Sequence, residues 1–176
     1  MKKVISVISI VFVFLILYFL QENFFSWFTI YGIKPNLFLI FVAVIGLFLG
    51  KDYGFGLGVI FGLFLDLFSS GIIGITSIVL GAVGGLAGVL EKNFSRDHRL
   101  TFLLIITILT IIGEVLFYLI TIVINKAGIQ IREFTIILLI EILYNNLITI
   151  IFYPLIQNSG KALINGLLEN KKVFKG

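Results

Sequence analysis

Long apolar stretches dominate this sequence, and the few charged residues gather between them. A helix that crosses the hydrocarbon core of a bilayer needs about 17–25 mostly apolar residues, and six stretches come close to that length. With 60% hydrophobic and 12% charged residues, the chain has no polar segment long enough to form a separate soluble core. The pattern predicts an all-α polytopic membrane protein, with six transmembrane helices in one compact bundle.

The predicted spans cover residues 4–20, 33–50, 54–70, 72–90, 101–124 and 134–156. The first span follows two lysines as a signal peptide would, but no small-residue cleavage site comes after it, so we expect it to be retained. Residues 1–160 form one transmembrane domain in this interpretation. Residues 161–176 form a basic cytoplasmic tail, which either is frayed or folds as a short amphipathic helix on anionic lipid.

Positive charges are distributed unevenly between the two sides of these spans. With the N-terminus inside, ten lysines and arginines fall in inner segments and three in outer segments. Cytoplasmic loops of membrane proteins carry such an excess, so both termini are expected to be cytoplasmic. The aromatic segment 24–31 is expected to lie in the outer interface, where Trp and Tyr rings prefer to sit. The three outer cations are Lys34, Lys126 and Arg132.

Glycines repeat every four residues in the third span and continue in the fourth. A four-residue step keeps positions on one slowly winding helix face, and glycine there lets a neighbouring backbone approach closely. We therefore expect the third and fourth spans to form a tight antiparallel hairpin. The packing glycines are predicted to be Gly54, Gly58, Gly62, Gly81 and Gly85.

Three carboxylates fall within spans: Asp66, Glu114 and Glu141. No lysine or arginine lies deep in a span, so each acid must be protonated, hydrogen-bonded, hydrated or paired with another protein. Asn145 shares a helix face with Glu141, and Asp66 lies one turn before a predicted loop. Three interpretations remain open for this set: a polar network that fixes packing, a ligand pocket or proton path, and contact with a partner's transmembrane helix.

The sequence offers no recognisable catalytic machinery. It has no cysteine and one histidine, His98, in a predicted cytoplasmic loop. It contains no nucleophile–base pair and no metal-ligand spacing, and its glycine-rich stretch has Val59 where a dinucleotide-binding motif needs its third glycine. We expect a non-enzymatic protein without cofactor or metal. The positive charge is interpreted as setting topology rather than binding nucleic acid.

Parts of the sequence resemble the MreD family of bacterial rod shape-determining membrane proteins. The resembling parts are residues 32–37 at the start of the second span, the glycine series ending in Leu65-Asp66-Leu67, and residues 69–74. The family typically has Gly-x-x-Pro-Asp-Leu, then a glycine-rich span ending in Leu-Asp-Leu, and a short loop into Leu-Gly. Asn36 replaces the usual Asp, and Ile73 replaces the usual Leu.

The resemblance implies a scaffold of the cell-elongation machinery in the bacterial cytoplasmic membrane. Such proteins bind the bitopic protein MreC and, through it, cytoskeletal MreB and the RodA–penicillin-binding-protein synthase, so they help control cell shape and peptidoglycan synthesis. The family is also similar in fold to the vitamin-binding subunits of energy-coupling-factor transporters. This leaves solute binding as the alternative function, and outer-half acids such as Asp66 and Glu141 would suit its pocket.

Overall fold

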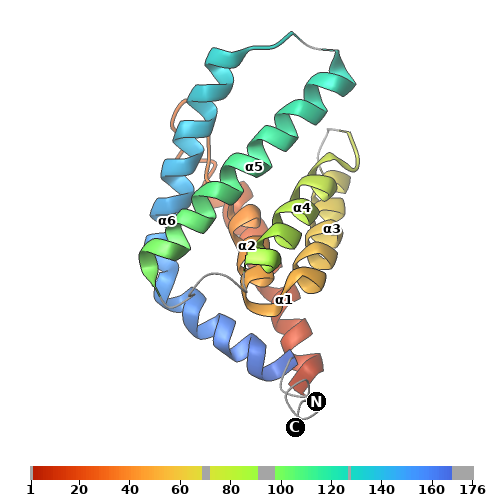
Figure 1. Ribbon diagram of the computed structural model, residues 1–176, viewed down its shortest axis with the longest axis vertical. Coiled ribbons are helices and arrows are strands. Elements are labelled where there is room, and N and C mark those ends of the chain that lie inside the picture. The colour runs from red at the N-terminus through yellow and green to blue at the C-terminus, as the bar shows by residue number, and fades with distance from the viewer. Residues whose placement is uncertain (1, 69–71, 91–97, 127, 168–176) are drawn as a thin grey trace.

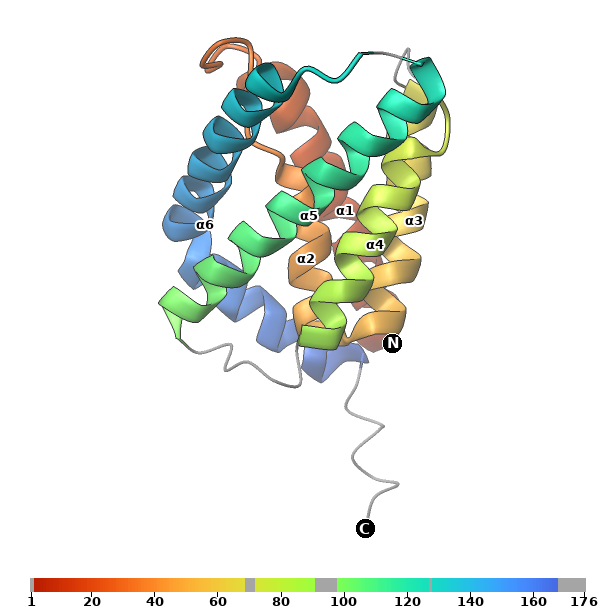
Figure 2. The same cartoon turned by 45° about the horizontal axis from the view of Figure 1, so that its top comes forward.

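The computed structural model describes residues 2–68, 72–90, 98–126 and 128–167, which are largely α-helical. Successive helices alternate in direction, so α1, α3 and α5 begin at the end of the bundle where α2, α4 and α6 finish (Figure 1 and Figure 2). This arrangement agrees with the predicted all-α bundle. The helices are α1 (Lys2–Phe19), α2 (Leu37–Leu49), α3 (Lys51–Phe68), α4 (Ile75–Leu90), α5 (Arg99–Asn125) and α6 (Ile131–Leu167), and a short π-helical turn, η1 (Leu20–Phe24), continues α1.

The described helices differ in whether they are long enough to cross a membrane. Three segments are long and apolar enough by length and composition: Lys3–Phe24, Arg99–Asn125 and Ile131–Leu167. The apolar helices α2 and α4 are shorter. At about 1.5 Å per residue, α2 is about 20 Å long, against about 30 Å for the hydrocarbon core. Helix α2 therefore begins or ends within the depth of the bundle.

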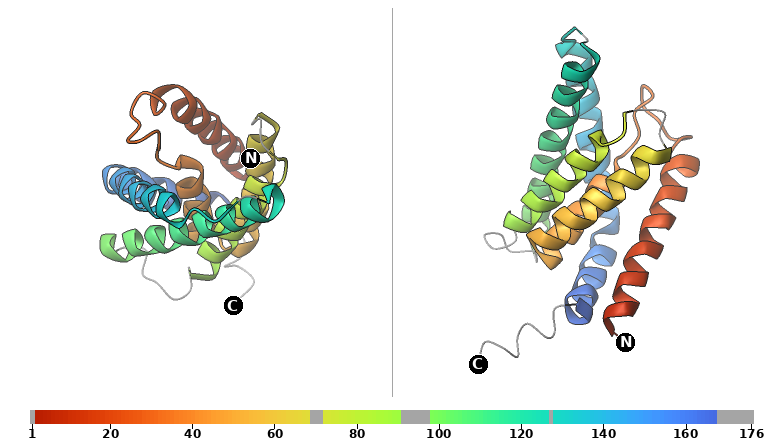
Figure 3. Two further views of the ribbon diagram at one scale, coloured as in Figure 1. Left: turned by 90° about the horizontal axis from the view of Figure 1, so that it is seen from above. Right: turned by 90° about the vertical axis from the view of Figure 1, so that its right-hand side faces the viewer.

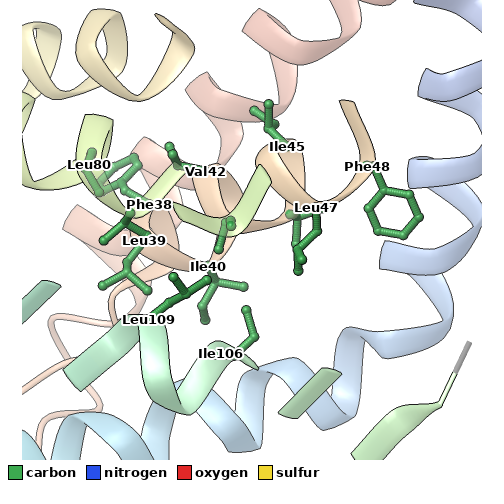
Figure 4. Packing of buried hydrophobic residues seen from close by; sticks show 14 of the residues in the cluster. Phe38, Leu39, Ile40, Val42, Ile45, Leu47, Phe48, Leu80, Ile106 and Leu109 are labelled. Atoms are coloured by element: carbon green, nitrogen blue, oxygen red, sulfur yellow. The ribbon is translucent and has the colours of Figure 1, made fainter. Parts of the chain in front are cut away.

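Helix α2 is the centre of the bundle. It packs against all five other α-helices, and every one of its residues except Phe41 is buried. A helix that is apolar all round is expected to be buried on all sides, and Figure 4 shows its side chains pointing toward several neighbours, including Leu80 of α4 and Leu109 of α5. Figure 3 shows α1 along one side of this core, where Phe14 stacks on Phe61 of α3 at 4.2 Å between ring centroids.

Two predicted helix starts were wrong, and the reason is local. Helix α2 begins at Leu37 and not at residue 33, because a residue before proline, here Lys34, is disfavoured in the α conformation. Asn36 then caps the helix, since its side chain accepts a hydrogen bond from the Leu39 amide. Helix α4 begins at Ile75 and not at residue 72, directly after Gly74, which has a φ of +106°.

Helix α6 continues beyond the predicted end of the sixth span at residue 156 and reaches Leu167. It bends in the region of Pro154 (Figure 1), where the ring removes a backbone donor and disturbs the preceding turn. The apolar face predicted for a lipid-bound tail packs instead on the protein core, through Leu163, Ile164 and Leu167. Residues 168–176 of that tail lie outside the described part of the chain.

The aromatic connection between η1 and α2 contains a two-residue hairpin. The backbones of Ile30 and Ile33 exchange two hydrogen bonds, and Tyr31 and Gly32 between them have φ angles of +53° and +77°, as in a type I′ turn. The hydroxyl of Tyr144 donates to the Phe28 carbonyl at 2.9 Å and ties this connection to α6. Its placement in the outer membrane interface remains a prediction.

Candidate functional site: glycine contacts, capped helix starts and a carboxyl pair

Helices α3 and α4 make the most extensive helix contact in the described chain, as the glycine pattern predicted. A Cβ atom on any of three α3 glycines would overlap the backbone of α4. Only glycine permits so close an approach, because any larger side chain would separate the two backbones. The glycines are Gly54, Gly58 and Gly62, and the backbone atoms they meet belong to Gly84, Leu80 and Ser77, respectively.

The glycines of α4 meet α3 in two ways. Gly84 and Gly88 meet the backbone of α3 and of the turn before it. Gly81 and Gly85, which the sequence favoured, meet only side chains, and a Cβ at Gly85 would lie at an ordinary 3.6 Å from the nearest atom of Phe55. Gly84 and Gly88 are four residues apart, as Gly81 and Gly85 are. The sequence spacing therefore could not show which pair faces the backbone of α3, because that depends on how α4 is rotated about its axis.

Asp66 accepts hydrogen bonds from the backbone amides at the start of α4. It is buried at 4% exposure, and its carboxylate accepts hydrogen bonds from the amides of Gly74 at 2.8 Å, Ser77 at 3.2 Å and Thr76 at 3.3 Å. The first amides of a helix have no partner within the helix, and a negative group there is favoured by the helix dipole. This is the geometry that a capping role for Asp66 requires.

A second cluster of polar side chains accepts hydrogen bonds from the backbone amides at the start of α2. The Asn36 amide donates to Oδ1 of Asn145 on α6 at 2.8 Å, and the Leu37 amide donates to Oε1 of Gln21 at 2.8 Å. The Asn145 side-chain amide in turn donates to Thr110 of α5 at 3.1 Å. Because the first amides of α2 lie away from water, these side chains replace the solvent that an exposed helix start would use.

Glu114 on α5 and Glu141 on α6 meet beside this cluster. Their side-chain carboxyl groups lie close enough to interact directly. Glu141 also contacts the side chains of Asn36 and Asn145. Sequence reasoning singled out both acids and Asn145, and the structure brings these three together, whereas Asp66 belongs to the separate cluster at α4.

Sequence reasoning missed Gln21 and Thr110 and gave Asn36 no structural role. The signal that would have found Asn36 is the Lys34-Pro35-Asn36 sequence, because a polar residue after proline and before an apolar run is a typical N-cap. Gln21 had no comparable signal, since its partner Leu37 is fixed only by the path of the connection. Among the described residues, no group of three or more His, Cys, Asp or Glu could hold a metal ion.

A family model for the rod shape-determining protein MreD matches residues 1–159. The chain belongs to the MreD family. No match was found among curated proteins or among solved structures. The likeness to energy-coupling-factor subunits therefore remains a prediction, whereas the rod shape-determining role and membrane character follow from the MreD family.

The capped start of α2 shows how this MreD-family chain can carry Asn36 in place of the usual aspartate. Asn36 stands where the family typically has Asp, and its Oδ1 atom accepts from the Leu39 amide at 3.0 Å. Asn and Asp are comparable N-caps, because both offer a side-chain oxygen at the same distance from the backbone. In this chain the capping oxygen therefore belongs to a neutral amide beside Glu141.

Proposed function

We propose that this chain is a non-enzymatic scaffold of the cell-elongation machinery that binds an MreC-like bitopic protein. Through that partner it would be linked to MreB and to the RodA–penicillin-binding-protein synthase, and so to peptidoglycan synthesis. The observation that carries the proposal is the MreD match over residues 1–159. In this proposal the chain crosses the bacterial cytoplasmic membrane six times, with both termini in the cytoplasm and membrane lipid around it.

The way the chain uses its polar side chains supports a scaffold over a solute-binding subunit. Asp66, which would suit an outer pocket, has its carboxylate engaged by three backbone amides of its own chain. Gln21 and Asn145 are likewise engaged at the start of α2. A solute site needs polar groups that converge on a cavity, whereas these groups converge on helix starts.

Depletion of the protein combined with affinity purification tests this proposal. Depleted cells are expected to become spherical, and the tagged protein, solubilised from native membranes, is expected to recover an MreC-like single-span protein. The control is an unrelated polytopic membrane protein with the same tag and expression level. Depleted cells that stay rod-shaped and lose uptake of a vitamin would contradict the scaffold and favour the transport subunit.

A further inference from the structure

The contact between Glu114 and Glu141 is a buried polar feature that capping does not explain. Glu141 is only 5% exposed, yet its Oε1 atom is buried without a hydrogen-bond partner among the residues that the structure describes. Two more oxygens of the same helix pair, Thr121 Oγ1 on α5 and Asn146 Oδ1 on α6, are in the same condition. Buried oxygens normally have partners, so the α5–α6 pair holds polar atoms that the described residues leave unsatisfied.

Three sides of the carboxyl pair are occupied by the chain itself. Toward the α5–α6 connection, Tyr118 and Phe134 stack with ring centroids 4.3 Å apart. In the opposite direction along the helices, Asn145 is hydrogen-bonded to Thr110. Toward the bundle centre lies the capped start of α2, whose Asn36 side chain contacts Glu141.

The remaining side is the outward face of α5. Ile111 and Phe117 lie one helical turn on either side of Glu114, and they are 37% and 41% exposed. Glu114 itself is only partly buried. A carboxyl group at the edge of a membrane-facing surface is costly, so this edge is expected to be covered.

We propose that the Glu114–Glu141 pair is a docking point for a transmembrane helix of the partner that presents a hydrogen-bond donor or a cation at this depth. Glu114 lies near the middle of α5, beyond the reach of lipid headgroups, and a helix is the element that brings a polar group there with its own backbone satisfied. This inference rests on the proposed function and specifies where its partner binds.

Paired variants test the role of the carboxyl group. Glu114→Leu is expected to reduce recovery of the single-span partner from native membranes, with Glu133→Gln, at an exposed acid in the first turn of α6, as the control. The loss is expected to be about 3- to 18-fold in the binding constant, the range of interhelical hydrogen bonds in membranes. Equal recovery by Glu114→Leu and the wild type would overturn the docking point while leaving the proposed function standing.

Photocrosslinking tests the location without removing a carboxyl group, and it decides the case in which Glu114→Leu fails to fold. A photoreactive phenylalanine analogue at Phe117 is expected to crosslink to the partner's transmembrane segment. The matched control is Phe12 on α1, which is 62% exposed. Crosslinking at Phe12 alone, or at neither position while the partner still co-purifies, would overturn the docking point. Failure of the wild type to recover any single-span partner would overturn the proposed function as well.

Discussion

Asp66 shows, at the scale of a residue, how a short helix can begin away from water. Its carboxylate accepts from three amides at the start of α4. Replacing it by leucine removes all three interactions and leaves the amides buried. We predict that Asp66→Leu lowers the free energy of unfolding by about 1–3 kcal/mol. Thermal unfolding of the purified protein in detergent, without any partner, measures this loss.

Two further variants separate capping from charge. Asp66→Asn retains one acceptor oxygen at the same position and is expected to lose less stability than Asp66→Leu. Asp52→Leu, at an exposed acid in the first turn of α3, is the matched control and is expected to change stability little. A stable Asp66→Leu protein that no longer recovers its partner would show that Asp66 is an interaction group and not a cap.

The side chains that accept hydrogen bonds from the first amides of α4 and of α2 differ in how far the sequence could predict them. Asp66 lies one turn before the loop that precedes α4, so its reach to the next helix start follows from local spacing. Asn145 is 109 residues from Asn36, and no pattern along α6 reveals that its partner is a backbone amide of α2. The contact of Glu114 with Glu141 likewise depends on how α5 and α6 are rotated against each other, which apolar periodicity leaves open.

At the scale of elements, adjacent glycines of α4 provide a matched test of the hairpin. Alanine has a higher helix propensity than glycine by about 1 kcal/mol, which favours the substitution at both Gly84 and Gly85. A Cβ at Gly84 would overlap the backbone of Gly54, whereas one at Gly85 lies 3.6 Å from Phe55. We predict that Gly84→Ala lowers the melting temperature and that Gly85→Ala leaves it unchanged or raises it.

The informative result is which of the two variants has the lower melting temperature, because both add the same methyl group to neighbouring positions of one helix. Overpacking typically costs about 1–3 kcal/mol, enough to outweigh the gain in propensity at Gly84. Equal melting temperatures for the two variants would contradict the close backbone contact. A lower melting temperature for Gly85→Ala alone would restore the register that the sequence favoured.

Helix type was predictable along this chain, but several helix ends were not. Long apolar runs require helices in a bilayer because every backbone group must be satisfied internally. The ends depend on single residues. Because of Pro35 and Asn36, α2 begins later in the sequence than predicted, and because of Gly74, α4 does too. The sequence predicts that the last span ends at residue 156, yet α6 bends in the region of Pro154 and continues to Leu167, because its final apolar residues pack on the core.

At the scale of the whole molecule, the alternating helix directions place the start of α1 and the end of α6 at the same end of the bundle (Figure 2). The turn between α2 and α3 lies at that end too, and α3 begins there at Lys51. Ten of the thirteen lysines and arginines fall on this side in the topology predicted from the sequence. The positive-inside rule therefore predicts that this side faces the cytoplasm, and that orientation can be tested.

We predict that reporters inserted at Lys51 and at the C-terminus report the cytoplasm, whereas reporters at Lys34 and Gly128 report the outside. Lys34 and Gly128 lie in the connections at the opposite end of the bundle, because an odd number of helix passes separates each of them from the N-terminus, whereas an even number separates the two termini. Paired reporters, one active only in the cytoplasm and one only outside, serve as mutual controls at every position. Outside signals at both Lys51 and the C-terminus would contradict the charge argument. Opposite signals at these two positions would contradict the bundle order, because no orientation of this bundle places its α2–α3 turn and its ends on different sides.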